Sequence, residues 1–257
     1  MFKEDFEAAG NASVSKYTLL KKNPGGYFLL AMLAGMFIGF GVLLAFTVGG
    51  QLAGAPAAKL AMGATFGVAL SLVMMAGAEL FTGNNLVMAA GVLEKKVTLG
   101  NAVYLWIICW LGNAAGGILL ALLYHLTGLG DGAAGAFMAS GALAKMTATP
   151  IQLLTRGILC NMLVCLAVWC GFRCKSESGK LIMVFWCLLA FITTGFEHSI
   201  ANMTLLTLAL INNGGNEAIT MGGYWFNLLT VTLGNMIGAI LFVAIPYYVA
   251  QLDKQKA

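Results

Sequence analysis

The sequence predicts an all-α membrane protein with six transmembrane helices, and three observations lead to that fold class. Of its 257 residues, 60% are hydrophobic and only 9% are charged, whereas a soluble domain carries roughly 25% charged residues. Six apolar runs reach the length that a membrane helix needs, which is about 20 residues. A short polar motif occurs twice, once in each half of the chain. The bilayer is therefore the expected surrounding of this chain.

The charged head of the chain, residues 1–22, precedes the first apolar run. We expect it to form a short amphipathic helix along the inner membrane face. Because many apolar runs follow, the first run is a membrane helix rather than a cleaved signal peptide. The apolar contacts of the head are expected from Phe2, Phe6, Val14 and Tyr17.

The second and fifth apolar runs are too long for one straight helix, and each contains one of the polar motifs. We expect each to be a helix, a break and a half-helix, with the breaks at Leu80–Gly83 and His198–Ala201. Unpaired backbone at this depth is tolerated only inside protein or along a cavity.

A kinked but continuous helix is the alternative interpretation of each of these two runs. The six predicted spans are residues 26–50, 60–91, 99–125, 150–172, 180–211 and 224–250.

The recurring motifs indicate a duplication. Residues 77–84 and 195–202 both read G-x-E-x-x-x-[GA]-N, and residues 111–117 and 233–239 both read L-G-N-x-x-G-[GA]. Each half then has three helices with the broken one in the middle. Three is odd, so the second half enters the membrane from the opposite side, and the repeat is inverted. The transmembrane channel domain is expected over residues 23–250, with repeat one at about 23–125, repeat two at about 146–250 and a tail at 251–257.

The basic residues predict the orientation. Most of them lie in the head, in the tail and in the connections after the second and fourth spans. By the positive-inside rule, both termini then lie in the cytoplasm. The net charge of +4 is too small and too scattered for a nucleic-acid-binding protein. The basic residues on the predicted cytoplasmic side are Lys3, Lys16, Lys21, Lys22, Lys95, Lys96, Arg173, Lys175, Lys180, Lys254 and Lys256.

His198 and Thr82 are the candidates for a central site. Both lie at a predicted break, and the two breaks are expected to meet near the middle of the membrane. A histidine on an apolar face is often only a buried core residue. An imidazole at a break can instead donate a hydrogen bond to an anion or transfer a proton near neutral pH.

Glu79 and Glu197 occupy the same position in the two motifs. One interpretation makes them proton carriers. The other, which we favour, is that each accepts hydrogen bonds from backbone N–H groups freed at its break. Asn84 and Asn202, together with Asn113 and Asn235, are expected to tie the half-helices to neighbouring helices.

One lysine precedes the first span of each half, and the two lysines are predicted on opposite sides of the membrane. Lys16 and Lys145 are expected at vestibule mouths, where a cation concentrates anions; ordinary solvated lysines are the alternative. Apolar residues near the breaks are either plain core or a dry constriction that opposes bare ions. These residues are Phe66, Leu70, Leu80, Phe81 and Phe191.

Catalytic and metal-binding patterns are not found in the sequence. The six cysteines include no C-x-x-C pair, so we interpret them as small apolar residues rather than ligands or a disulfide framework. There is no Walker motif, no acidic cluster and no Ser/His/Asp arrangement. An enzyme is therefore not expected, nor is a cofactor.

Longer motifs extend over nearly the whole chain, and together they resemble those of the formate/nitrite transporter family. The resemblance implies a homopentamer of aquaporin-like protomers, each with one pore for small monovalent anions of weak acids. It also implies that Thr82 and His198 form the pore centre, that the five apolar residues above form slits, and that Lys16, Lys145 and Asn161 lie in the vestibules. The motifs are M-G-A-T-F-G-V-A-L at 62–70, A-E-L-F-T-G-N at 78–84, L-G-N-x-x-G-G at 111–117, R-G-I-L-C-N-M-L-V-C-L-A-V-W at 156–169, W-C-L-L-A-F-I at 186–192, G-F-E-H-S-I-A-N-M at 195–203 and V-T-L-G-N at 231–235.

The functional expectation is a pentameric channel or secondary carrier in a bacterial inner membrane. Nitrite or formate is the expected anion, with proton coupling at His198 as one possibility. Hydrosulfide is an alternative within the same family. A neutral-solute pore and an occluded scaffold or sensor are alternatives from other classes.

Overall fold

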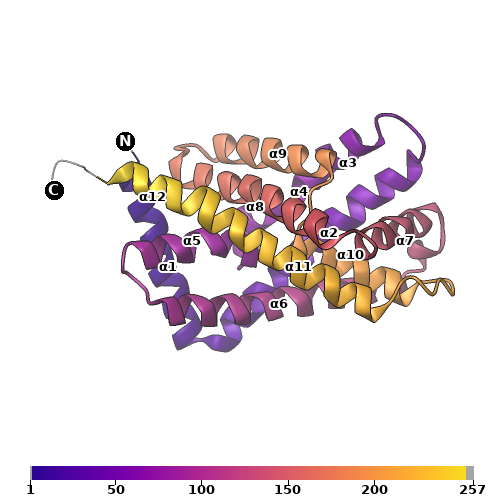
Figure 1. The fold of residues 1–257 in the computed structure, drawn as a ribbon, viewed down its shortest axis with the longest axis horizontal. Helices are drawn as coiled ribbons and strands as arrows, with labels where there is room; N and C mark the ends of the chain where they lie inside the picture. Colours follow the sequence, from indigo (N-terminus) through magenta and orange to yellow (C-terminus); the bar gives the residue numbers. More distant parts are fainter. Residues whose placement is uncertain (1, 253–257) are drawn as a thin grey trace.

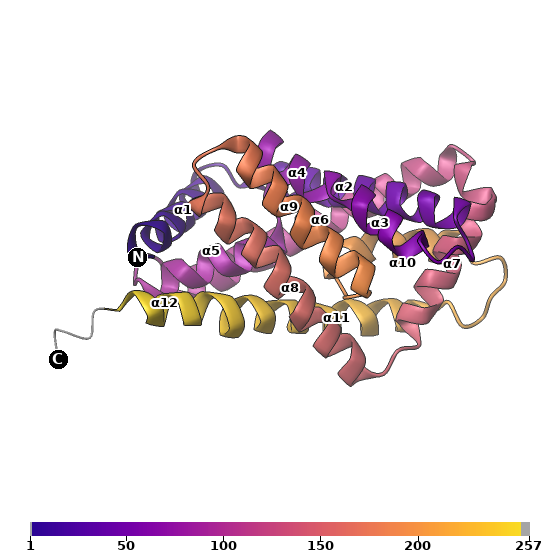
Figure 2. The ribbon, with the colours of Figure 1, turned by 90° about the horizontal axis from the view of Figure 1, so that it is seen from above.

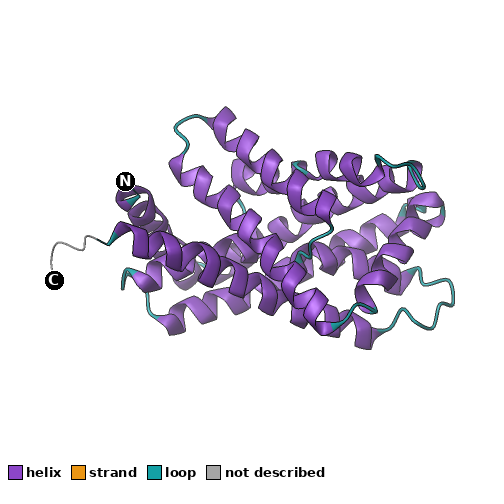
Figure 3. Cartoon of the chain, turned by 45° about the horizontal axis from the view of Figure 1, so that its top comes forward, coloured by secondary structure: helices purple, strands orange, loops and turns teal. Residues whose placement is uncertain are grey.

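The computed structural model describes residues 2–252, and within them the chain forms only helices and loops (Figure 3). This confirms the predicted all-α class. Each predicted span overlaps a helical segment that is long and apolar enough to cross a membrane. Part of the predicted tail, residues 253–257 with Lys254 and Lys256, lies outside the described residues. The six spans are Pro24–Gln51, Ala58–Gly77, Leu99–Leu126, Pro150–Arg173, Glu177–Thr194 and Met221–Gln251.

The individual elements follow one another with short connections (Figure 1). Three π or 3₁₀ segments, labelled η, interrupt or join the α-helices. The order is α1 (Lys3–Lys22), α2 (Pro24–Gln51), α3 (Ala58–Phe66), α4 (Val68–Leu72), η1 (Val73–Gly77), α5 (Phe81–Leu93), α6 (Leu99–Leu126), η2 (Leu129–Asp131), α7 (Ala133–Met146), α8 (Pro150–Arg173), α9 (Glu177–Thr194), α10 (Ser199–Ile211), α11 (Met221–Ala239), η3 (Ile240–Ala244) and α12 (Ile245–Gln251).

Side-chain caps begin five of the six spans, because the first N–H groups of a helix have no partner within it. Asn23 caps α2 and is followed by Pro24, whose missing N–H costs nothing at that position. Thr149 caps α8 in a capping box with Gln152. Comparable caps come from Thr98, Ser176 and Thr220.

The two halves have the same internal packing. Helix α2 packs along α6 in the first half, and α8 packs along α11 in the second. The half-helices α5 and α10 each have 13 residues. Figures 1 and 2 place α5 in the left half of the bundle and α10 in the right half, with the start of α1 and the end of α12 both at the left. This arrangement matches the predicted repeat of three spans with a broken middle one.

The breaks lie three residues earlier than predicted. The extended segments begin after Gly77 and Gly195, whose φ angles of +80° and +82° favour glycine. They end at Leu80 and His198, which precede the first residues of α5 and α10. Gly83, expected in the break, is helical. The prediction placed Thr82 and Gly83 within the first break, whereas they lie in the first turn of α5, and the first glycine of each motif turns the chain.

Two glycines allow α6 to approach α2 closely. A Cβ on Gly116 would collide with the main-chain oxygen of Met32, and a Cβ on Gly35 would collide with that of Asn113. In the second half, Gly238 has the same relation to Ile158. Small residues at such crossings let helix backbones touch, and the two crossings hold each half together.

Two helices lie outside the repeat of spans. Helix α7 was not predicted, because its 14 residues are too few to cross a bilayer and are rich in alanine and glycine. Helix α1 packs against α5, α8 and α12. Its Phe6 is fully buried against Trp169, whereas Val14 is 40% exposed.

The close α2–α6 crossing predicts that Gly116→Ala destabilises the protein by about 1–3 kcal/mol, because the added methyl group meets backbone that cannot rotate away. Gly25→Ala is the matched control, since a Cβ there has nothing within 4 Å. Thermal unfolding in detergent is the measurement. Equal unfolding temperatures for the two variants would contradict the close crossing.

Candidate functional site

The two breaks bring Thr82 and His198 together. His198 immediately precedes α10, and Thr82 is the second residue of α5. Their side chains lie 3.0 Å apart between Thr82 Oγ1 and His198 Nε2, and both are buried. The two half-helices therefore begin at one point, with their N-terminal ends directed at each other. The positive end of each helix dipole favours an anion there.

The hydrogen bonds of His198 define its tautomer. The backbone N–H of Ala201 donates to Nδ1 over 3.1 Å, so Nδ1 is an acceptor and carries no proton. In a neutral imidazole the proton then lies on Nε2, which donates to Thr82 Oγ1. The ring also stacks on Phe191, with centroids 5.9 Å apart. This N-cap contact fixes one N–H donor toward Thr82.

A closed apolar constriction surrounds the imidazole and leaves no space for a water molecule. Phe66 and Phe191 meet edge to face across it, with ring centroids 5.6 Å apart. Four of the five predicted constriction residues are found in this wall. The lining residues are Ile38, Phe66, Leu70, Leu80, Val164, Leu188, Phe191 and His198.

Two hollows flank this constriction and share lining residues with it. The Lys145 vestibule has a volume of about 280 Å³ and reaches Phe66 and His198. Its other polar lining residues are Lys59, Ser140 and Asn202. Because Phe66 and His198 also line the constriction, this vestibule ends at the imidazole.

The second hollow, the Lys16 vestibule, has a volume of about 390 Å³ and reaches Leu70 and Leu80. Its polar lining residues are Lys16, Glu79 and Asn84. The vestibules thus approach one constriction from its two sides, and together they form a candidate pathway along the bundle.

The positions of Phe81 and Asn161 differ from those expected. Leu80 has an extended backbone, so its side chain and that of Phe81 point to opposite sides. Phe81 lines a separate hollow beside Trp106 and Trp110. Asn161 is fully buried and donates to the main-chain oxygens of Thr82 and Asn235, rather than lining a vestibule.

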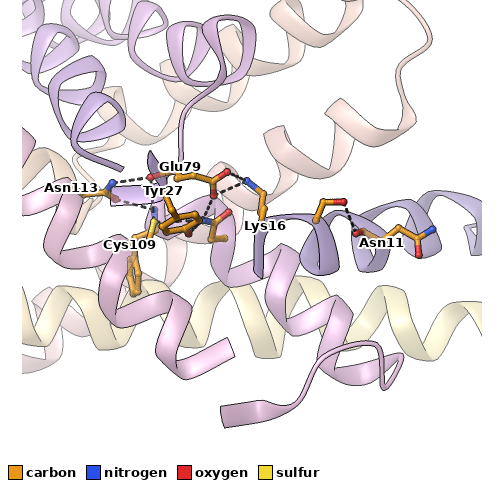
Figure 4. A network of polar contacts seen from close by, with 9 residues as sticks. Asn11, Lys16, Tyr27, Glu79, Cys109 and Asn113 are labelled. Atoms are coloured by element: carbon orange, nitrogen blue, oxygen red, sulfur yellow. Dashed lines mark hydrogen bonds and ion pairs between the residues drawn. The ribbon is translucent and has the colours of Figure 1, made fainter. Parts of the chain in front are cut away.

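Glu79 and Glu197 bind side chains rather than the freed backbone N–H groups expected for them. Glu79 accepts from Lys16 over 2.7 and 2.8 Å and from Asn84 over 2.8 Å (Figure 4). Glu197 pairs with Lys145 at 2.8 Å and accepts from Asn202 over 2.7 Å. Lys16 and Lys145 are therefore compensated cations, because each carries a carboxylate partner.

Asn113 and Asn235 hold the breaks. The amide oxygen of Asn113 accepts from the Phe81 N–H at 2.9 Å, and its amide nitrogen donates to the carbonyl oxygens of Glu79 and Ala31. Asn235 makes the equivalent bonds to Ser199, Glu197 and Gly157. Each amide thus satisfies both sides of a break from a neighbouring helix.

Sequence reasoning missed several supporting side chains. Tyr27 accepts from Asn84, and the Cys109 thiol donates to the carbonyl oxygen of Glu79 (Figure 4). Asn227 links Asn202 to the carbonyl oxygen of Lys145. These residues lie in otherwise apolar helices, so their polarity was the available signal. Within residues 2–252, no group of three or more His, Cys, Asp or Glu side chains is arranged to hold a metal ion.

Comparisons with known proteins all point to one family of membrane transport proteins. A family model described as "Formate/nitrite transporter" matches residues 3–249. The nitrite transporter NirC of Escherichia coli (strain K12) is 42% identical over 251 residues, which cover 95% of this chain and 89% of that protein. The formate channel FocA of the same organism is 31% identical over 267 residues, covering 96% of this chain and 92% of that protein.

Solved structures give the same result. An "FNT family ion channel" superposes with a TM-score of 0.92 at 38% identity, covering 98% of this chain and 100% of that chain. A "Pentameric formate channel with formate bound" superposes with a TM-score of 0.79 at 30% identity, covering 91% of this chain and 99% of that chain.

The buried pair Lys145–Glu197 predicts that removing only the lysine destabilises the protein more than neutralising both partners. Lys145→Met leaves a carboxylate whose side chain is 3% exposed without its cation, and it should destabilise the protein by about 3 kcal/mol. The double variant Lys145→Met/Glu197→Gln should cost less than this single change.

The control for this cycle is the exposed pair Lys180–Glu177, whose glutamate side chain is 65% exposed. Lys180→Met should cost less than about 1 kcal/mol. Thermal unfolding in detergent measures all the variants. If Lys145→Met and Lys180→Met cost the same, the buried pair does not stabilise the break.

Proposed function

The chain belongs to the formate/nitrite transporter family, and on that basis we propose that it conducts nitrite or formate through the pathway at His198. It is a multi-pass membrane protein and a transport protein, not an enzyme. The single observation that carries the proposal is the convergence of two half-helix N-termini on the Thr82–His198 pair between two vestibules.

The assembly and orientation are part of the proposal. The formate channel among the solved relatives is pentameric, and we propose the same number of copies here, each with its own pathway. The start of α1 and the end of α12 lie at one end of the bundle. The basic residues at that end support its placement in the cytoplasm of a bacterial cell, with the protein in the inner membrane. The Lys145 vestibule then opens outward.

The first step is dehydration at the apolar wall. An anion that leaves either vestibule meets apolar side chains such as Phe66 or Leu80, in a constriction with no room for a water molecule. The loss of hydration is offset by the positive ends of α5 and α10. Lys16 and Lys145 act by neutralising Glu79 and Glu197, so that no net negative charge at the vestibules repels the anion.

The second step is a hydrogen bond at the centre. The Nε2–H of His198, which donates to Thr82 in the closed state, turns to the anion, and the Thr82 hydroxyl adds a second donor. Proton transfer from a neutral imidazole would leave Nδ1 to be protonated, but Nδ1 faces the Ala201 N–H. The geometry therefore favours an anion held by hydrogen bonds over one protonated by His198.

Flux into proteoliposomes tests the substrate class. Nitrite and formate influx should exceed that of protein-free liposomes, whereas glycerol influx should not. The highest rate among nitrite, formate and hydrosulfide identifies the preferred anion, so hydrosulfide is tested directly. Glycerol-driven swelling without anion flux would instead indicate a neutral-solute pore, and no flux at all would indicate a scaffold.

The variant His198→Asn separates the donor from the helix cap. Asparagine is a good N-cap, so the fold should persist, but its short amide cannot reach the position of Nε2. We expect nitrite flux to fall roughly tenfold or more, which corresponds to losing one buried hydrogen bond to a charge. Thr82→Ser, which keeps the hydroxyl, is the matched control and should retain flux. Full flux in His198→Asn would refute the donor role.

A further inference from the structure

The two vestibules differ in net charge although the halves are related by a repeat. The lining of the Lys16 vestibule contains one cation, Lys16, and one anion, Glu79, which are paired at 2.7 Å. In the Lys145 vestibule, Lys145 is paired with Glu197, but Lys59 is also present. Within residues 2–252, no acidic side chain lies within ion-pair distance of Lys59. Only this vestibule has an uncompensated cation.

The place of Lys59 in its helix is unfavourable for stability. It is the second residue of α3, whose first turn has no acidic residue and whose N-terminus has no side-chain cap. A cation at a helix N-terminus opposes the helix dipole. The spacing that relates Glu79 to Glu197 also relates Lys59 to Glu177, an acidic residue that suits the first turn of α9. The first half thus carries a charge at this position that its helix does not favour.

From this asymmetry, and resting on the proposed function, we infer that Lys59 makes the Lys145 vestibule the tighter anion-binding face of the pathway. Lys59 is exposed to solvent while lining the same hollow as His198. An anion that reaches this hollow is attracted by a full charge before it meets the constriction. An anion in the Lys16 vestibule meets a cation already satisfied by Glu79.

A tighter face has a defined kinetic signature. The pathway only equilibrates the anion, so at zero membrane potential kcat/KM is equal from the two faces. Lys59 lies at the mouth, away from the dry constriction that forms the central barrier. It therefore deepens one binding well without lowering that barrier, and such binding lowers KM and kcat together at that face. KM and kcat at the other face do not depend on Lys59.

The experiment measures nitrite uptake in right-side-out and inverted membrane vesicles from the same cells, at low ionic strength and with the membrane potential clamped to zero. The unmodified protein should show a KM roughly fivefold lower at one face. Lys59→Gln should raise KM and kcat at that face only, so that the two faces become alike. High salt should reduce the difference in the unmodified protein.

Two controls accompany this measurement. Lys59→Arg keeps the charge and should keep the asymmetry. Lys21→Gln removes another exposed lysine, one that lines neither vestibule, and should change nothing. Lys59→Gln should also unfold at no lower temperature than the unmodified protein, which separates an effect on binding from an effect on folding.

The outcomes that overturn the inference are specific. Equal KM values at the two faces of the unmodified protein would overturn it, and so would a Lys59→Gln variant that shifts both faces or neither. Absence of nitrite and formate flux in the unmodified protein would overturn the proposed function and this inference with it.

Discussion

The constraint on which the rest of the structure depends is that main-chain N–H and C=O groups cannot remain unpaired inside a bilayer. Each broken span exposes such groups where its helix ends and its half-helix begins. Asn113 and Asn235 satisfy them, because one amide both accepts from the first N–H of the half-helix and donates to a carbonyl oxygen of the extended segment. A helix cannot do this for itself, since its own carbonyl groups are already used.

Holding the break in place creates a second demand, which is electrostatic. The extended segments carry Glu79 and Glu197, which are 8% and 2% exposed. A buried carboxylate without a cation is strongly unfavourable. Lys16 and Lys145 supply that cation from α1 and α7, the two helices outside the spans. These two helices therefore belong to the candidate site, because each positions the lysine that pairs with the glutamate of one break.

Much of this arrangement was predictable from the sequence, and the rest was not for identifiable reasons. The six spans and the inverted repeat followed from apolar length and from motif pairs, which are local signals. The convergence of Thr82 and His198 followed from the repeat. The lysine partners of Glu79 and Glu197 lie 63 and 52 positions away in the sequence, and pairing over such separations leaves no periodic trace. The position of Asn161 also depended on packing, since a polar residue in an apolar helix has no preferred face until its neighbours are known.

The comparison of the two halves separates what the membrane requires from what the pathway requires. Both halves have the turning glycine, the glutamate and the bridging asparagine at equivalent places, because each break has the same unsatisfied backbone. They differ where side chains face the pathway: Leu80 corresponds to His198, and Lys59 corresponds to Glu177. One imidazole at the centre gives a single donor whose proton is placed by its own helix cap. A symmetric pair of imidazoles would bring a second ring into a space too small for a water molecule. The supporting frame is therefore symmetric, whereas the candidate pathway contains side chains, such as His198 and Lys59, that occur in only one half.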